Sequence, residues 1–251
     1  MARIVLVTGA AGGVGRALCR RFLAEECMVV AFDINADALA ELKDKSGQGG
    51  GRLHTRVVDI SDYEAVTSAV ASVESSVGPI DVLVNNAGWD VFRNFLDTDH
   101  ALRSKVVAIN LAGPINMMHA VLTEMAKRGR GRVVTIASDA GRIGSSGQAV
   151  YSACKGGVIA LTKSLARELA RKGVLLNAVC PGPMPTAMLE DFFKQGPGGA
   201  KVAEAIVRAI PLKRIGQPED IPGIVSFLAS DDAAFITGQV ISVSGGLTMH
   251  G

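Results

Sequence analysis

The sequence predicts an α/β protein with a doubly wound, seven-stranded, mostly parallel sheet and helices on both of its faces. Two observations predict this class. Strand-like segments alternate with helical segments along the chain, which is typical of a parallel sheet covered on both sides. The first strand-like segment is a continuous apolar run, as expected for a strand buried on both faces. The 251 residues are enough for one domain with a substantial core, so we expect a single domain over residues 1–251.

The elements follow in order along the chain. The first strand is Arg3–Thr8, and the helix after it has an apolar face formed by Val14, Leu18 and Phe22 at spacing i, i+4, i+8. Met28–Asp33 is the second strand. Further strands are expected at about 52–58, 80–84, 131–137, 174–180 and 239–243, and further helices at about 36–46, 62–77, 100–128, 148–172 and 218–230. An irregular stretch at about 184–211, rich in Gly, Pro and Met, is expected to form a substrate lid.

Composition narrows the class of partners. The formal charge of +2 is too small to indicate nucleic acid binding. The four cysteines, at positions 19, 27, 154 and 180, show no CxxC and no zinc-type spacing, so we expect reduced thiols, no metal site and a cytoplasmic location. Because the first strand begins at Arg3, no signal peptide is expected, and no apolar run is expected to reach membrane-spanning length.

The glycine-rich turn from Thr8 to Gly15 joins the first strand to the first helix. The N-terminus of a helix favours an anion, because its free N–H groups and its dipole both point there. Gly9 permits a tight turn, Gly13 lets the backbone approach phosphates, and Gly15 lets helix and strand pack closely. A strand before the turn and a helix after it favour a dinucleotide site over a simple loop.

Asp33 ends the second strand, close to the position where an acid contacts the adenosine ribose of a dinucleotide. Its carboxylate would also repel a 2′-phosphate, and Ile34-Asn35 follow it in place of a basic residue. The sequence therefore predicts NAD as cofactor. The alternative is that Asp33 caps a helix, but Asn35 and Asp37 serve that role equally well.

Tyr151 and Lys155 are four residues apart on a predicted helix and so lie on one face. A tyrosine is a poor base at its ordinary pKa of about 10, and we expect the Lys155 ammonium, with an oxidised nicotinamide, to favour the phenolate. Ser138 ends a strand and can hold a substrate oxygen. By itself Ser138 would be a turn serine and Tyr151 a half-buried aromatic. Cys154 is expected to be a small filler residue.

These motifs occur in the order and spacing of the short-chain dehydrogenase/reductase family, which the chain resembles over essentially its whole length. The other residues that carry the resemblance are Asp59, Asn85-Asn86-Ala87-Gly88, Asn110, Pro181-Gly182 and Thr186. The resemblance implies a Rossmann-type fold, an NAD-dependent oxidoreductase acting on a secondary CH–OH group, and a homotetramer. Met184, between two prolines, departs from the family pattern, which often has Val or Ile there.

The resemblance also implies residue roles. Asn110, Ser138, Tyr151 and Lys155 would form a catalytic tetrad, in which Asn110 distorts its helix and holds a water that connects Lys155 to solvent. Lys155 would also bind the nicotinamide ribose, and Thr186 the carboxamide. The predicted cofactor-binding residues are Gly9, Gly13, Val14, Gly15, Asp33, Ile34, Asp59, Ile60, Asn86, Ala87, Gly88, Tyr151, Lys155, Pro181, Gly182, Met184 and Thr186. Without the resemblance, Asn110 would be a plain helix residue and Asp59 a cap.

The substrate is predicted from weaker signals. Segments 85–95 and 236–249, with Ser138-Asp139, are similar to 2-hydroxycyclohexanecarboxyl-CoA dehydrogenases of anaerobic aromatic degradation. We therefore expect oxidation of a cyclic or aryl-substituted secondary alcohol to its ketone, with a 2-hydroxy-alicyclic acyl-CoA as first choice. Arg93 and Arg142 are expected at the mouth, to meet an anionic group. The predicted substrate-binding residues are Ser138, Trp89, Asp139, Tyr151 and Met188.

Three alternatives stay open. The chain can be an aryl secondary-alcohol dehydrogenase of the phenylethanol type, which needs an apolar pocket but no basic mouth. It can be a 3-oxoacyl thioester reductase, although those of carrier proteins usually favour NADPH, against Asp33. It can also be a non-catalytic dinucleotide-binding sensor or assembly protein, but such chains usually lack a member of the tetrad. Trp89 has its own alternative, which is packing in the core.

Overall fold

The structure, a computed structural model, describes residues 2–46, 51–185 and 204–249. Seven strands of the described chain form one sheet in the order β3-β2-β1-β4-β5-β6-β7, and all six pairings are parallel. The strands are β1 (Ile4–Thr8), β2 (Met28–Asp33), β3 (Leu53–Val57), β4 (Val82–Asn85), β5 (Gly131–Ile136), β6 (Val174–Pro181) and β7 (Val240–Val243). The predicted seven-stranded α/β fold is confirmed, and the sheet is parallel throughout rather than mostly so.

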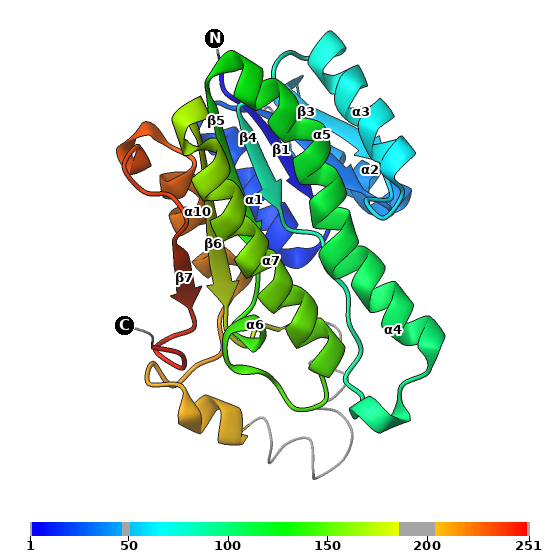
Figure 1. The fold of residues 1–251 in the computed structure, drawn as a ribbon, viewed down its shortest axis with the longest axis vertical. Coiled ribbons are helices and arrows are strands. Elements are labelled where there is room, and N and C mark those ends of the chain that lie inside the picture. Colours follow the sequence, from blue (N-terminus) through cyan, green and yellow to red (C-terminus); the bar gives the residue numbers. More distant parts are fainter. Residues whose placement is uncertain (1, 47–50, 186–203, 250–251) are drawn as a thin grey trace.

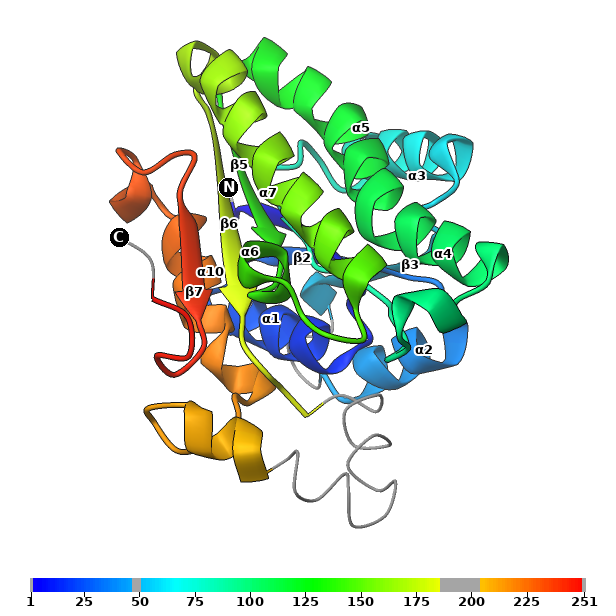
Figure 2. The ribbon, with the colours of Figure 1, turned by 60° about the horizontal axis from the view of Figure 1, so that its bottom comes forward.

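Helices cover both faces of the sheet (Figures 1 and 2). The helices are α1 (Gly13–Ala24), α2 (Ala36–Asp44), α3 (Tyr63–Ser76), α4 (His100–Val107), α5 (Gly113–Arg128), α6 (Ala140–Ile143), α7 (Ala149–Leu169) and α10 (Pro222–Leu228). Shorter turns are η2 (Phe95–Asp97), η3 (Ala108–Ala112), η4 (Ala170–Lys172), η5 (Pro218–Asp220) and η6 (Asp231–Ala233). Residues of α1, α2 and α10 share one large core cluster, and residues of α3, α5 and α7 share a second.

Strand β1 shows why the sheet needs apolar runs. Its five residues are all buried. Val5 and Val7 belong to the cluster under α1 and α10, whereas Ile4 and Leu6 belong to the cluster under α3 and α5. Successive side chains of a strand point to opposite faces, so each face of this central strand contributes to a different core.

The predicted helix at 100–128 is divided into α4 and α5 by the π-helical turn η3. Asn110 lies in this turn and is fully buried. Its amide Nδ2 donates to the carbonyl of Val106, 2.9 Å away, and to the carbonyl of Trp89, 2.6 Å away. A side chain inserted into the helical ladder in this way is a recognised cause of a π-bulge, and the distortion expected at Asn110 is present.

The continuous helical stretch His100–Arg128 is long and apolar enough to pass a length-and-hydropathy test for a membrane span. A buried core helix passes the same test, so this match does not contradict the expectation that no segment spans a membrane. The apolar side chains of α5, including Met117, Val121 and Met125, are buried in the core cluster shared with α3 and the sheet. Such burial is what a core helix covering a sheet requires.

Other boundaries differ slightly from the prediction. The short helix α6 directly after β5 was not predicted, since its four residues are too few to show a helical period. The segment at 148–172 is helical, but its last turn is the 3₁₀ turn η4. The segment at 218–230 begins as the 3₁₀ turn η5. Most of the predicted lid, including residues 186–203, lies outside the described residues.

Candidate active site

A cavity of about 1480 Å³ lies at the carboxyl ends of the strands. Its walls come from the segments that follow β1, β2, β3, β4, β5 and β6. The order of the strands reverses between the neighbours β1 and β4, because the chain crosses from β3 to the far side of β1 to form β4. A crevice at such a switch point is where open α/β sheets bind ligands. Every predicted cofactor-binding residue that the structure describes lines this cavity, and Thr186 lies outside the described residues.

The glycine turn at one end of the cavity admits no side chain at two of its positions. Gly9 has φ of +60°, and a Cβ there would lie 2.7 Å from the Cα of Ala87. A Cβ on Gly15 would lie 2.1 Å from the carbonyl oxygen of Gly9. Both contacts are far too short for real atoms, so the tight approach of β1, α1 and the segment after β4 depends on glycine.

The same turn leaves the N-terminus of α1 facing the cavity. Gly12 caps this helix and provides no side-chain bond to it, and Gly13 has only a proline side chain at 3.5 Å from a Cβ position. Free backbone N–H groups at a helix N-terminus, with no side chain between them and the cavity, fit the pyrophosphate of a dinucleotide. These residues would hold that group.

Asp33 lines the cavity beside this turn. Its carboxylate accepts hydrogen bonds from the backbone N–H of Ala11 (2.9 Å) and of Asn35 (3.0 Å). Asn35 is the residue that caps α2, through a bond from the N–H of Ala38. Asp33 therefore does not cap this helix; it braces the glycine turn and leaves a carboxylate at the cavity wall.

Arg16, which the sequence analysis did not consider, is the basic residue nearest to the glycine turn in the chain. Its guanidinium donates to the carbonyls of Ala11 (2.7 Å) and Ala38 (3.2 Å) and pairs with Glu41 at 2.7 Å. Arg16 is not among the residues that line the cavity. A guanidinium held in this way is not directed at a ligand beside Asp33.

Asn86 connects the two turns at the switch point. Its Nδ2 donates to the carbonyls of Thr8 and Gly9, both at 3.0 Å, and its backbone N–H donates to the Thr8 hydroxyl. The amide nitrogen of Asn86 is thus bonded within the protein. One oxygen of Asp59, Oδ1, is also bonded within the protein, because it accepts from the N–H and the hydroxyl of Ser61.

At the other end of the cavity, α7 presents Tyr151 and Lys155 (Figure 2 shows the helix). The Lys155 ammonium nitrogen lies 5.5 Å from the centre of the Tyr151 ring and donates to the carbonyl of Ile136 at 2.9 Å. Ser138 follows β5 and accepts a bond from the N–H of Ala140 at 3.1 Å. Three of the four predicted tetrad residues therefore line one region of the cavity.

Burial shifts the pKa values of both Tyr151 and Lys155. Burial raises the pKa of Tyr151 to about 12, against a hydrogen bond with Ser138 that lowers it, and the Asp90 charge raises it further. Burial also lowers the pKa of Lys155 to about 8. In the protein alone, desolvation disfavours the charged form of both groups. The expected effect of the lysine charge and of an oxidised nicotinamide on the phenolate stays a prediction.

Asn110, the fourth residue, lies directly behind this region. Its Oδ1 accepts from the backbone N–H of Trp89 at 3.1 Å. A Cβ placed on Gly88 would lie 3.1 Å from Asn110 Oδ1 and 3.5 Å from Lys155 Nζ. Gly88 therefore packs against both polar groups, and the π-turn brings Asn110 close to the lysine, as the resemblance implies.

Of the predicted substrate residues, Ser138 and Tyr151 line the cavity as described above. Trp89 lines the cavity, half-buried, with Lys105 Nζ 4.1 Å from its ring centre, so it is not a core residue. Asp139 also lines the cavity, but one of its oxygens accepts a 2.5 Å bond from the Ser242 hydroxyl of β7. Met188 lies outside the described residues.

Of the two arginines expected at the mouth, only Arg93 lines the cavity. The prediction for Arg142 is wrong. Its guanidinium donates to the carbonyl of Val240 (3.2 Å) and to the hydroxyl of Ser242 (2.9 Å), so it fastens α6 to β7. The exposed cation that accompanies Arg93 at the cavity is Lys105 of α4, which the sequence analysis missed.

Asp90 and Gln148 are two further cavity residues that were missed. Gln148 Nε2 donates to Asp90 Oδ2 at 3.0 Å. Gln148 comes three residues before Tyr151 at the start of α7, a spacing that predicts a neighbouring position on the helix. Asp90 gave no comparable signal, because it lies in an irregular segment.

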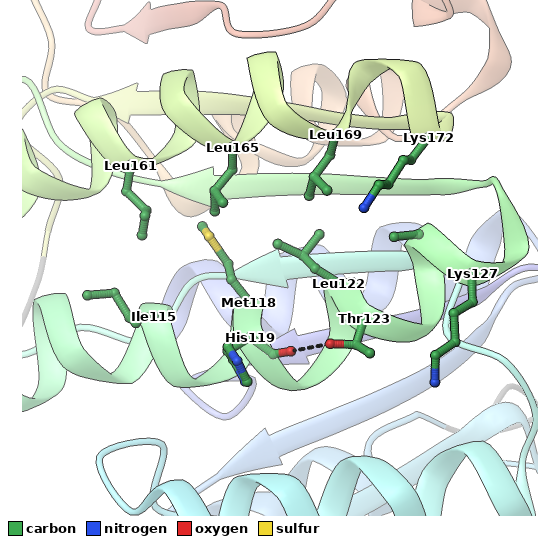
Figure 3. A pocket seen from close by; sticks show the side chains of 11 residues that line it. Ile115, Met118, His119, Leu122, Thr123, Lys127, Leu161, Leu165, Leu169 and Lys172 are labelled. Carbon is green, nitrogen blue, oxygen red and sulfur yellow. Dashed lines mark hydrogen bonds between the residues drawn. The ribbon is translucent and has the colours of Figure 1, made fainter.

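A second cavity, of about 610 Å³, lies between α5 and α7 (Figure 3). Leucines of α7 and apolar side chains of α5 face each other across it, with Lys127 and Lys172 near one end. None of the predicted tetrad or cofactor-binding residues lines this groove, so it is separate from the candidate active site.

Comparison with known proteins gives the class. Residues 9–248 match the family model described as enoyl-(acyl carrier protein) reductase. The chain is 41% identical over 247 residues to an acetoacetyl-CoA reductase of Shinella zoogloeoides, covering 98% of both chains. It is also similar to an NAD⁺-bound xylitol dehydrogenase (33% identity, TM-score 0.92, 97% of this chain and 98% of that one). A third match is an actinorhodin polyketide ketoreductase variant with NADPH (34% identity, TM-score 0.93, 99% and 98%).

The chain therefore belongs to the short-chain dehydrogenase/reductase family. It is an oxidoreductase of alcohol and ketone groups that uses a nicotinamide dinucleotide. The predicted family is confirmed by these matches. The narrower likeness to 2-hydroxycyclohexanecarboxyl-CoA dehydrogenases finds no support among them, since relatives with this degree of identity include acetoacetyl-CoA reductases.

Proposed function

We propose that the protein transfers hydride between NAD(H) and the carbon β to the carbonyl of an acyl thioester, interconverting a 3-hydroxyacyl and a 3-oxoacyl group. The comparisons favour this substrate class, which the sequence analysis kept as an alternative, over the alicyclic first choice. The two share their chemistry. A 2-hydroxy-alicyclic acyl-CoA also carries its hydroxyl on the carbon β to the thioester carbonyl, so it stays within the proposed class as a cyclic member.

The protein residues supply the proton transfer and the orientation. In the oxidation direction, the bound dinucleotide supplies the hydride acceptor. Tyr151, as the phenolate, takes the proton from the substrate hydroxyl, whose oxygen Ser138 holds by a hydrogen bond. Lys155 then passes a proton on toward Asn110 and solvent. Because burial disfavours both the phenolate and the ammonium, a positive nicotinamide beside Tyr151 would lower the cost of forming the phenolate.

The single observation that carries the thioester proposal is the acetoacetyl-CoA reductase relative, which matches over 98% of both chains. The charges of the cavity support it. Arg93 and Lys105 are exposed residues of its lining, and cations at an opening suit the phosphates of CoA. The reacting group would lie deeper, between Tyr151, Ser138 and Trp89.

The test compares kcat/KM for reduction by NADH of four ketones with the same enzyme preparation: acetoacetyl-CoA, 2-oxocyclohexanecarboxyl-CoA, acetoacetyl-N-acetylcysteamine and acetophenone. We expect the CoA thioesters to exceed the N-acetylcysteamine ester, and Arg93→Ala with Lys105→Ala to remove that advantage. A higher value for acetophenone than for every thioester would replace this proposal with the aryl-alcohol dehydrogenase. No turnover of any of the four would favour the non-catalytic dinucleotide-binding alternative.

We propose NAD as the preferred cofactor. Similar structures hold NAD⁺ in one case and NADPH in the other, so the family alone does not choose. The Asp33 carboxylate at the cavity wall disfavours a 2′-phosphate, and Arg16 is paired with Glu41 instead of facing that position. The homotetramer and the cytoplasmic location stay predictions. A mass measurement in solution tests the homotetramer, and substitutions in the apolar groove between α5 and α7 would test whether that groove is a subunit contact.

A further inference from the structure

Asp90 is a carboxylate inside the reacting end of the cavity that the proposed mechanism does not use. It is half-buried and lines the cavity together with Ser138 and Tyr151. Its charge reaches the reacting group, since it is among the causes that raise the pKa of Tyr151. A half-buried carboxylate beside a catalytic tyrosine makes deprotonation of that tyrosine harder, so the presence of Asp90 needs a separate explanation.

The position of Asp90 is fixed by two bridges between neighbouring loops. Gln148 Nε2 donates to Asp90 Oδ2 at 3.0 Å, and Gln148 Oε1 accepts from the Ser145 hydroxyl at 3.0 Å. The backbone N–H of Arg93 donates to the carbonyl of Gly147 at 2.8 Å. Asp90 therefore belongs to a wall held at both ends, in which its carboxylate cannot easily move away from a bound substrate.

The charge of Asp90 is not compensated by a cation. Within residues 2–46, 51–185 and 204–249, no ion pair includes Asp90. Its polar partner Gln148 is neutral. Burial raises the pKa of Asp90, against the hydrogen bonds that lower it. Of the cations that line the cavity, Arg93 and Lys105 are exposed and Lys155 is buried, and none of them is among the causes that shift the pKa of Asp90. The wall beside Gln148 thus carries a negative charge that no ion pair within the described residues balances.

We infer that Asp90 is a specificity-determining residue that excludes substrates with an anionic group beside the reacting carbon. A free 3-hydroxy or 3-oxo acid carries a carboxylate two bonds from that carbon, whereas its thioester is neutral there. Two like charges a few ångströms apart at a partly buried site repel strongly enough to reduce binding about 10- to 100-fold. This inference rests on the proposed function, and it explains how the enzyme would act on the activated acyl group and not on the free acid.

The test uses two probes that differ in charge but carry no CoA: 2-hydroxycyclohexanecarboxylate and its methyl ester. The measured quantity is the ratio of kcat/KM for the acid to kcat/KM for the ester. Any change in the pKa of Tyr151 acts on both probes and cancels in the ratio. In Asp90→Asn, which keeps an oxygen for Gln148, we expect the ratio to rise at least about 10-fold.

Two control variants separate charge from structure. Asp97→Asn removes an exposed carboxylate from the lining of the same cavity, and Gln148→Ala breaks the bridge but keeps the Asp90 charge. Neither is expected to raise the ratio. An unchanged ratio in Asp90→Asn, or an equal rise in Asp97→Asn, would overturn the inference. Asp90→Ser is the second variant if Asp90→Asn does not fold, and the same rise is required of it.

A second measurement distinguishes a failure of the role of Asp90 from a failure of the thioester assignment. Both probes are titrated into the enzyme–NADH complex, and the ratio of their Kd values is read from nicotinamide fluorescence. One outcome is that the CoA thioesters show no advantage, but the Kd of the acid divided by the Kd of the ester falls at least about 10-fold in Asp90→Asn. In that case the thioester assignment fails and the role of Asp90 stands. If the thioesters are preferred and neither ratio changes, the role of Asp90 fails alone.

Discussion

The two ends of the cavity are built in different ways. The end beside the glycine turn consists of backbone and of side chains whose polar atoms are bonded to the backbone, such as Asp33 and Asn86. The end beside α7 contains the buried titratable side chains Tyr151 and Lys155. The pKa of Tyr151 is raised and that of Lys155 is lowered, so the neutral form of each is favoured. The comparison teaches that one end is suited to hold a ligand by shape and fixed dipoles, and the other to change charge during a reaction.

The sharpest test of this contrast is Tyr151→Phe. The change removes the hydroxyl at the reacting end and leaves the glycine turn untouched, so we expect kcat to fall about 10²- to 10⁴-fold or more. The Kd for NADH, measured by nicotinamide fluorescence, should stay close to that of the unmodified protein. Cys154→Ala, three residues further along α7 and buried, is the control and should have a mild effect on kcat. Near-normal turnover of Tyr151→Phe would refute the role given to Tyr151.

At the opposite end, Asp33→Ala should narrow the preference for NAD over NADP. The carboxylate would meet the 2′-phosphate of NADP without a cation to pair with, so we expect a preference of about 10- to 100-fold in the unmodified enzyme. The measurement is kcat/KM for both cofactors on the same substrate. Equal values in the unmodified enzyme would contradict the prediction.

The structure adds a control to this experiment. Asp33 also accepts the backbone N–H groups of Ala11 and Asn35, so Asp33→Ala loses a brace as well as a charge. Asp33→Asn removes the charge and keeps an oxygen acceptor for one of these bonds. If charge sets the preference, Asp33→Asn narrows it as Asp33→Ala does. If only Asp33→Ala changes it, the brace is the cause.

The smallest expected effect is on the pH profile. Reduction of a ketone consumes a proton, which Lys155 must carry to Tyr151 as the ammonium. The pKa of Lys155 is lowered to about 8. Above that pH the ammonium is lost, so kcat/KM for reduction should fall, by at most about tenfold per pH unit. Alcohol oxidation needs the opposite protonation state and should rise through the same range. The pKa of Tyr151, at about 12 in the protein alone, would place its own break beyond this range.

The profiles are measured between pH 6 and pH 10 in both directions of the reaction. Asp33→Asn is the matched control, because it alters the distant end of the cavity and should keep the same break near pH 8. If kcat/KM changes with pH in the same direction for oxidation and for reduction, the break does not come from a proton that Lys155 passes to or from Tyr151, and the prediction is contradicted.

Local sequence patterns by themselves determined much of the fold and the core of the site. Apolar runs predict strands buried on both faces, and β1 shows the reason, since its alternate residues enter different cores. The glycine turn follows from steric demands within a few residues. Tyr151 and Lys155 share a face because of helical spacing. Each of these features depends on residues close together in the chain, which is why the sequence reveals them.

Only the tertiary structure decided the rest. Asp90 meets Gln148 across 58 residues, and Arg142 is removed from the cavity by bonds to β7 nearly 100 residues away. The helix expected at 100–128 is continuous but contains a π-turn at Asn110, whose side chain bonds to Trp89 in a different segment. The pKa shifts of Tyr151 and Lys155 come first from burial, to which the whole fold contributes. No spacing in the chain encodes such contacts, because they arise where loops from separate strands converge at the same edge of the sheet.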